Sequence, residues 1–207
     1  MVPAVIIIVI SERIRMTPAT LILLGTALSM FFGAFISFMM VTTDADTLQS
    51  AYLWQVGNFS NISWDSIPFM LAITVVGSAI VMLLSNKMNV MSLCDSSAQS
   101  LGIDVRRFRT LALTLMAVMT AGIVSFVGII GFVGLVCPHI VRLVAGSDNR
   151  FVIPISMALS ALIVIVSDYI SMMNSSLAVG VVISAIGAPL FFILIVMSKT
   201  KGKGAIF

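Results

Sequence analysis

The sequence predicts an all-α membrane protein, a polytopic helical bundle of about six transmembrane helices plus a partial first one. Of its 207 residues, 60% are hydrophobic and 9% are charged, and the mean hydropathy is +1.19. Soluble domains carry about 25% charged residues. The apolar residues form long continuous runs, whereas the strands of a membrane barrel would alternate polar and apolar residues. Continuous runs of this kind indicate helices, which satisfy their own backbone groups in lipid.

The first apolar run, Met1 to Ile10, is too short to cross a bilayer, because ten helical residues rise only ~15 Å. We interpret it as the inner end of a span that begins upstream. A signal peptide is the alternative, but it needs a basic segment before the run and a small-residue cleavage site after it. The charged segment 11–15 follows instead. Thr17 and Pro18 then predict a helix start with proline at the first helical position.

The later apolar runs predict the spans 19–41, 67–84, 111–126, 129–145, 151–167 and 177–197. Several of these runs approach the ~20 residues that a ~30 Å hydrocarbon layer requires. The two runs beside Gly128 are short and indicate a tight hairpin. The polar segment 42–65 is predicted to be an outer loop, with Trp54 and Trp64 as aromatic residues at the membrane interface.

The eleven basic residues decide the orientation. If the run 19–41 points outward, all eleven fall at one membrane face. The positive-inside rule makes that face cytoplasmic and places the carboxyl terminus inside. The net charge of +3 therefore reflects the orientation of the protein in the membrane, and we expect no nucleic-acid partner.

The sizeable inner loop covers residues 86–109, within a single transmembrane domain that we assign to residues 1–207. Asp95 or Ser96 can cap a short helix there, Leu101 gives it an apolar contact, and Gly102 can end it in the left-handed conformation. Two short helices with small residues on one face would form a surface for another protein. An ordinary interhelical loop is the alternative, and the local sequence alone favours it.

Small residues and prolines recur in the later spans, at Gly128, Gly131, Gly134, Gly180, Gly187 and Pro189. The first three are three residues apart, which predicts one stripe of a helix. Small residues allow helix backbones to approach each other where lipid removes the hydrophobic driving force. We therefore expect these positions to serve close packing rather than substrate contact.

His139 is the single histidine. Pro138 removes a backbone donor and frees a carbonyl one turn earlier, so we expect His139 to hydrogen-bond local backbone groups. It has no second ligand at helical spacing, and we predict no metal site. Arg142 is predicted to lie at the inner boundary with Asp148 and Arg150, where an ion pair or snorkelling explains it.

The remaining polar residues indicate no chemistry. Asp168 is expected to face a water-filled interior, and a proton relay would need a second acid or histidine at helical spacing. Cys94 and Cys137 are interpreted as packing residues. We find no catalytic triad order and no phosphate-binding loop. We therefore expect no catalytic residue and no cofactor, so another chain would have to hydrolyse any ATP used.

Four short sequence blocks resemble the permease family of iron-siderophore, haem and cobalamin importers, and they occur in the same order as in that family. Its members are the FecCD/BtuC-like membrane subunits of type II ABC importers. The blocks are the outer-loop positions Trp54, Gly57 and Trp64, the inner loop, residues 128–150, and Gly180 with residues 185–191. The resemblance covers essentially the whole chain but only the carboxyl-terminal part of a family subunit. The first spans of the family would lie upstream of Met1.

The resemblance implies a permease subunit in the inner (cytoplasmic) cell membrane that moves an iron-siderophore, haem, cobalamin or similar metal chelate into the cytoplasm. Its partners would be the lipid bilayer, a cytoplasmic ABC ATPase, an extracytoplasmic substrate-binding protein and a second permease subunit in a homodimer. Two alternatives stay open: a secondary transporter, which should show paired intramembrane carboxylates, and a non-functional fragment of a permease.

The resemblance also implies that short coupling helices of the inner loop dock into the ATPase. The corresponding residues are Leu93, Asp95, Ala98, Leu101, Gly102 and Val105. Two departures from the family matter. Cys94 stands where the family usually has glycine, and the outer turn 172–178 lacks the family's arginine and its Glu-x-Pro pattern. The contact residues of the first coupling helix are therefore less well defined than those of the second, and we expect docking of the binding protein at this outer turn to be weakened, rerouted or lost.

Overall fold

The computed structural model describes residues 5–7, 10, 18–59, 62–92, 95–173 and 177–203. In these ranges the chain consists of helices and their connections, as the sequence predicts. The order is α2 (Pro18–Val41), α3 (Ala45–Val56), the 3-10 turn η1 (Trp64–Ser66), α4 (Ile67–Met91), α5 (Asp95–Ser100), α6 (Val105–Val127), α7 (Val133–Ala145), α8 (Asn149–Met173) and α9 (Val179–Lys203).

Four of these helices, α2, α4, α6 and α8, are long and apolar enough to cross a membrane. Helix α7 has 13 residues and rises only about 20 Å. Helix α9 has 25 residues, and its segment Val179–Leu194 is apolar. Each predicted span therefore contains a helix, but the span 129–145 is only partly helical.

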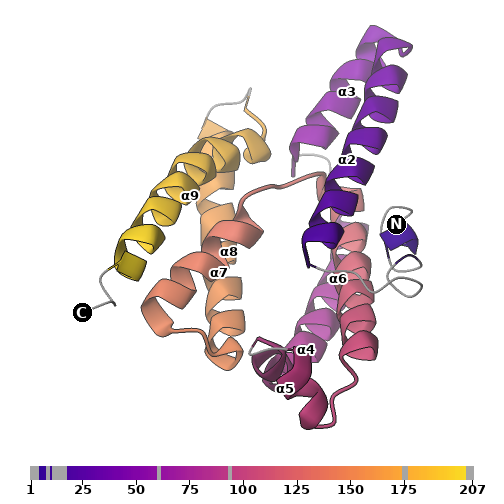
Figure 1. Ribbon diagram of the computed structural model, residues 1–207. Coiled ribbons are helices and arrows are strands. Elements are labelled where there is room, and N and C mark those ends of the chain that lie inside the picture. Colours follow the sequence, from indigo (N-terminus) through magenta and orange to yellow (C-terminus); the bar gives the residue numbers. More distant parts are fainter. Residues whose placement is uncertain are drawn as a thin grey trace.

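Helix α8 is central to the packing, because it contacts α4, α7 and α9. In Figure 1, α7, α8 and α9 form one side of the molecule, while α4 and α6 form the other. The core lies mainly between α7, α8 and α9, where Cys137, Val152 and Ile183 are almost completely buried. Helix α5 lies at the end of the molecule where α7 turns into α8 (Figure 1).

The outer surfaces of the helices are apolar. Leu83 is 80% exposed, Phe192 is 68% exposed, and none of the α2 span is buried within this chain. Such faces are expected where the solvent is lipid or a neighbouring helix. The structure thus leaves the whole α2 span available to lipid or to other partners.

Both predicted connections between spans contain helix. The segment 42–65, which we predict to be an outer loop, includes α3 and the start of η1. Helix α4 continues to Met91, well into the predicted inner loop. Leu93 and Cys94 lie outside the described residues, and α5 is the one short helix that the structure describes in this loop.

Candidate transport and coupling sites

Three helix ends meet at one point, which we call the glycine junction: Gly57, Gly128 and Gly180. Gly57 ends α3 and Gly128 ends α6, both with positive φ (84° and 79°), while Gly180 lies in the first turn of α9. The backbone N–H of Gly180 donates to the Gly57 carbonyl at 3.3 Å. The N–H of Asn58 donates to the Val127 carbonyl at 3.0 Å. Backbone hydrogen bonds therefore join α3, α6 and α9.

Only glycine fits at this junction. A Cβ atom on Gly128 would lie 1.9 Å from the Trp54 carbonyl oxygen, and one on Gly180 would lie 1.7 Å from the Val56 carbonyl oxygen. A Cβ on Gly187 would lie 2.7 Å from Phe132 Cβ. Such separations are far inside van der Waals contact, so a side chain at Gly128, Gly180 or Gly187 would force its neighbour to move.

Gly131 and Gly134 differ from that expectation. The predicted stripe is wrong because α6 ends at Gly128, residues 129–132 are not helical, and α7 begins only at Val133. An added Cβ on Gly131 or Gly134 would have no neighbour within 4 Å. Packing inside this chain therefore does not account for these two glycines, and both face open space.

The segment 129–132 is not helical and separates α6 from α7. Phe132 has a φ of 63°. Among the described residues it is the one non-glycine residue with a positive φ. The N–H of Val133 donates to the Gly131 carbonyl at 2.7 Å, which satisfies part of the irregular backbone. Irregular backbone at membrane depth is tolerated where it is buried in protein or lines a water-filled cavity.

His139 does not fulfil its predicted role at Nε2. This nitrogen is buried without a hydrogen-bond partner, and so is the hydroxyl of Ser156 on α8. Pro138 lies inside α7 and Pro189 inside α9. In the part of the chain that the structure describes, no group of three His, Cys, Asp or Glu residues is arranged to hold a metal ion.

A hydrogen-bonded group joins α4, α7 and α8, and we call it the inner polar cluster: Asn86, Asn89, Arg142, Asp148, Asn149 and Arg150. Arg142 Nη2 donates to Asn149 Oδ1 at 3.1 Å. Arg142 therefore forms a hydrogen bond to an amide and no ion pair with Asp148, which is one of the two predicted explanations; snorkelling is the other. Sequence reasoning missed Asn86 and Asn89, which lie 59 to 64 residues from their partners.

Asp148 is the acidic member of the cluster. The backbone N–H of Arg150 and the carboxamide of Asn89 both donate to it, at 3.0 Å and 2.7 Å. These bonds, together with the positive charge of Arg150, hold the pKa of the Asp148 carboxyl below its ordinary value of 3.8. Hydrogen bonds to the charged form favour that form, so Asp148 is ionised at neutral pH.

Helix α5 ends as predicted, with Gly102 in the left-handed conformation. The N–H of Ile103 donates to the Ala98 carbonyl at 3.0 Å, and the N–H of Gly102 donates to the Gln99 carbonyl at 2.9 Å. With a φ of 78° at Gly102, this pair of bonds is a Schellman motif. Asp104 then caps α6, because its carboxylate accepts from the backbone N–H of Arg107.

The predicted coupling residues fall into two groups. Ala98 is 0% exposed and Val105 is 7% exposed, so their side chains pack within this chain and cannot contact a partner in this conformation. Leu101 is 66% exposed, and Gly102 is exposed with no neighbour near its missing Cβ. We call Leu101 and Gly102 the α5 tip. Leu93 lies outside the described residues.

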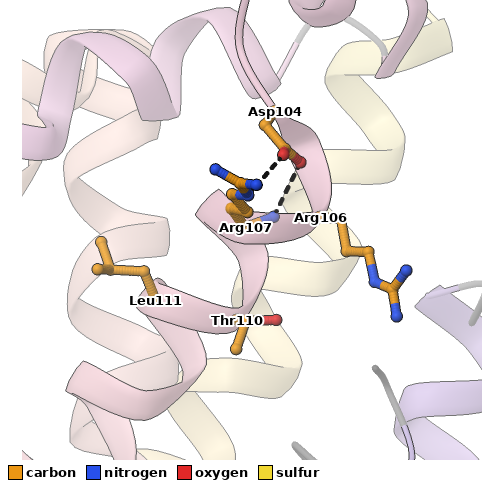
Figure 2. Close-up of a pocket in the computed structure, with 5 residues that line it drawn as sticks. All are labelled: Asp104, Arg106, Arg107, Thr110 and Leu111. Atoms are coloured by element: carbon orange, nitrogen blue, oxygen red, sulfur yellow. Dashed lines mark hydrogen bonds and ion pairs between the residues drawn. The ribbon is translucent and has the colours of Figure 1, made fainter. Parts of the chain in front are cut away.

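A shallow depression lies beside the α5 tip. Its lining residues are Asp104, Arg106, Arg107, Thr110 and Leu111. Arg107 Nε and Asp104 Oδ2 form an ion pair at 3.0 Å, while Arg106 points away from that pair (Figure 2). Because both arginines are exposed, this end of the molecule presents positive charge next to an apolar tip.

Four helices long and apolar enough to cross a membrane, joined by a capped turn with an exposed apolar tip, are the features of a polytopic helical membrane protein. Residues 1–197 match the FecCD transport family, and the chain belongs to that family. It is 35% identical over 178 residues to the cobalamin import system permease protein BtuC of Halobacterium salinarum, covering 86% of this chain and 48% of that protein.

A second curated relative and a solved structure are also similar to this chain. The Fe(3+) dicitrate transport system permease protein FecC of Escherichia coli is 32% identical over 178 residues, which cover 84% of this chain and 53% of that protein. A solved metal-chelate type ABC transporter in an inward-facing conformation has a TM-score of 0.84 and 28% identity, over 94% of this chain and 63% of its own. The chain thus spans about half the length of the curated relatives it matches.

Proposed function

We propose that this chain is the transmembrane permease part of an ABC importer that moves a metal chelate into the cytoplasm, driven by a separate ATPase. The observation that carries the proposal is the family match over residues 1–197. Relatives named for cobalamin and ferric dicitrate and a metal-chelate type neighbour support an iron-siderophore, haem, cobalamin or similar chelate as the substrate class.

We place the α5 end of the molecule in the cytoplasm, with the protein in the inner (cytoplasmic) cell membrane. Arg106, Arg107, Arg142 and Arg150 lie at this end, since the inner polar cluster ties the α7–α8 turn to the end of α4. The positive-inside rule supports this orientation. Figure 1 draws the end of α9 toward the same end of the molecule, which supports a cytoplasmic carboxyl terminus.

Residues 86–109 then form the cytoplasmic coupling loop of a single transmembrane domain. The exposed Leu101 offers the apolar contact, and Gly102 lets a partner backbone approach closely. Ala98 and Val105, buried inside the chain, hold the tip in position. Asp95 begins α5 and belongs to the same loop. Conformational change in the ATPase would move this loop and, through α4 and α6, the membrane spans.

We place the transport path beside the non-helical segment 129–132. Gly131 and Gly134 face open space there, at the start of α7, and irregular backbone within a membrane would be tolerated only in protein or beside water. A second permease subunit would cover the exposed face of α2 and close the path from the other side. The extracytoplasmic binding protein would dock at the opposite end from α5, near α3 and η1.

A matched pair of variants tests the coupling. Leu101→Arg places a charge at the α5 tip, whereas Gln49→Arg places the same charge on an exposed position of α3. An unpaired charge at a packed interface costs about 2–5 kcal/mol. We expect Leu101→Arg to lose co-purification with the ATPase by at least about tenfold and to insert normally, while Gln49→Arg assembles as the unsubstituted protein does. Full ATPase binding and uptake by Leu101→Arg would remove the α5 tip from the proposal.

A further inference from the structure

Asn89 joins the end of α4 to the start of α8 by two hydrogen bonds. Its Oδ1 accepts from the backbone N–H of Asn149 at 2.8 Å, and its Nδ2 donates to Asp148 Oδ1 at 2.7 Å. The first N–H groups of a helix have no partner within that helix. The carboxamide of Asn89 therefore caps α8 from another helix, across about 60 residues of sequence.

The other members of the cluster extend this junction. Asn149, which is 4% exposed, accepts from Arg142 Nη2 at the end of α7. Arg150 Nε donates to Asn86 Oδ1, one turn before Asn89 on α4, so both asparagines lie on the same side of that helix. The end of α4, the last turn of α7 and the start of α8 thus form one hydrogen-bonded unit.

This unit lies between the two parts of the molecule that transport would require. Helix α4 leads into α5 and its exposed tip, and α7 is the short helix whose start faces the open space beside Gly131 and Gly134. We propose that Asn89 is a positioning residue for transport, which fixes the α7–α8 hairpin to the segment carrying the α5 tip. Movement of the tip in the ATP cycle is then passed to α7. This inference rests on the proposed function.

A merely structural role for Asn89 predicts something different. If Asn89 served only to stabilise the fold, its loss would lower membrane insertion, ATPase binding and uptake together. A positioning role predicts that ATPase binding and ATP hydrolysis persist, because the α5 tip is intact, while uptake per ATP hydrolysed falls. The ratio of uptake to hydrolysis therefore separates the two roles.

The test uses a reciprocal exchange in the assembled transporter in proteoliposomes. Asn89→Asp removes the donor to Asp148 and places two carboxylates at hydrogen-bond distance, where like charges repel. We expect uptake per ATP to fall by about tenfold, a magnitude within measured coupling between contacting residues. Adding Asp148→Asn restores a donor and an acceptor across the junction, and we expect uptake per ATP to return to within about twofold of the unsubstituted protein.

Ser147→Ala is the matched control, since Ser147 is the neighbour of Asp148, is exposed, and lies outside both the cluster and the coupling loop 86–109. Normal uptake per ATP in Asn89→Asp, an equal defect in the double variant, or parallel loss of ATPase binding and uptake would each overturn the positioning role. Absence of ATP-driven uptake in the unsubstituted transporter is a distinct result, which would overturn the proposed function itself.

Discussion

Gly128→Ala is the substitution for which the structure predicts the largest effect from a single methyl group. Gly128 ends α6 with φ 79° and ψ −168°, a region of backbone conformation that is essentially restricted to glycine. The new Cβ would lie 1.9 Å from the Trp54 carbonyl oxygen and 3.1 Å from Gly57 Cα. Both neighbours are backbone atoms, so a side-chain rotation cannot relieve the contact.

The cost has two parts. Holding a non-glycine residue in this conformation costs about 1–3 kcal/mol. Restoring ordinary contact requires the Trp54 carbonyl to move by roughly 1.5 Å, the difference between 1.9 Å and the 3.4 Å at which ordinary contact begins. That shift breaks the bonds from Asn58 N–H to the Val127 carbonyl and from Trp54 Nε1 to the Ser125 carbonyl, at about 1 kcal/mol each. We expect a loss of about 3–5 kcal/mol in the free energy of unfolding.

Unfolding in mixed micelles with increasing denaturing detergent measures this loss, with the fluorescence of Trp54 and Trp64 as the probe. Gly131→Ala is the control, because its Cβ meets no atom within 4 Å, and we expect a change below about 1 kcal/mol. Equal stability of Gly128→Ala and the unsubstituted chain, or equal damage from both variants, would refute the glycine junction as a packing constraint.

Three further predictions concern topology, pH and the junction. A cysteine at Gln49 should react with an impermeant thiol reagent in intact cells, whereas one at Gln99 should not; the reverse pattern would invert the orientation. The pKa of Asp148 is held below 3.8 in the folded state. The ionised carboxylate therefore stabilises the fold fully above pH 3.8, and this contribution is lost as the pH falls through the lower pKa of the folded state. Asp148→Asn should abolish this part of the pH dependence of the unfolding free energy. Trp54→Phe removes the bond to the Ser125 carbonyl and should destabilise the chain by about 1 kcal/mol in the same detergent titration.

The features predicted well from sequence are those encoded by neighbouring residues. A long apolar run predicts a span whatever the tertiary arrangement, and helices occur in all six spans predicted between residues 19 and 197. Gly102 followed by an apolar residue is a local helix-ending pattern, and the structure contains the corresponding Schellman motif. Such features need no knowledge of the tertiary arrangement.

The break at 129–132 and helix α3 could not be predicted in this way. Hydropathy treats the apolar residues after Gly128 as part of a span, whereas Phe132 adopts a positive φ that only the surrounding packing determines. Helix α3 is weakly apolar and has no side-chain cap at Asp44. It is held at its end by the contacts of Gly57 with α9, which are distant in sequence.

The inner polar cluster was missed for the same reason. Asn86 and Asn89 pair with residues about 60 positions away, and no local pattern specifies those partners. One signal was present: two amides one turn apart at the end of an apolar helix have to satisfy their hydrogen bonds near the membrane boundary. Asp148 and Asn149, placed at the start of another span, offer the matching groups.

ATP-driven uptake is the measurement that bears most directly on the function proposed for these helices. Proteoliposomes containing the assembled permease, its ATPase and its binding protein would be supplied with radiolabelled cobalamin, haem or a ferric siderophore. We expect accumulation of one of these chelates only when ATP is present on the ATPase side, and we expect it to persist when a protonophore collapses the proton gradient. Uptake that follows the proton gradient without ATP, or no uptake of any of these chelates, would contradict an ABC importer of metal chelates.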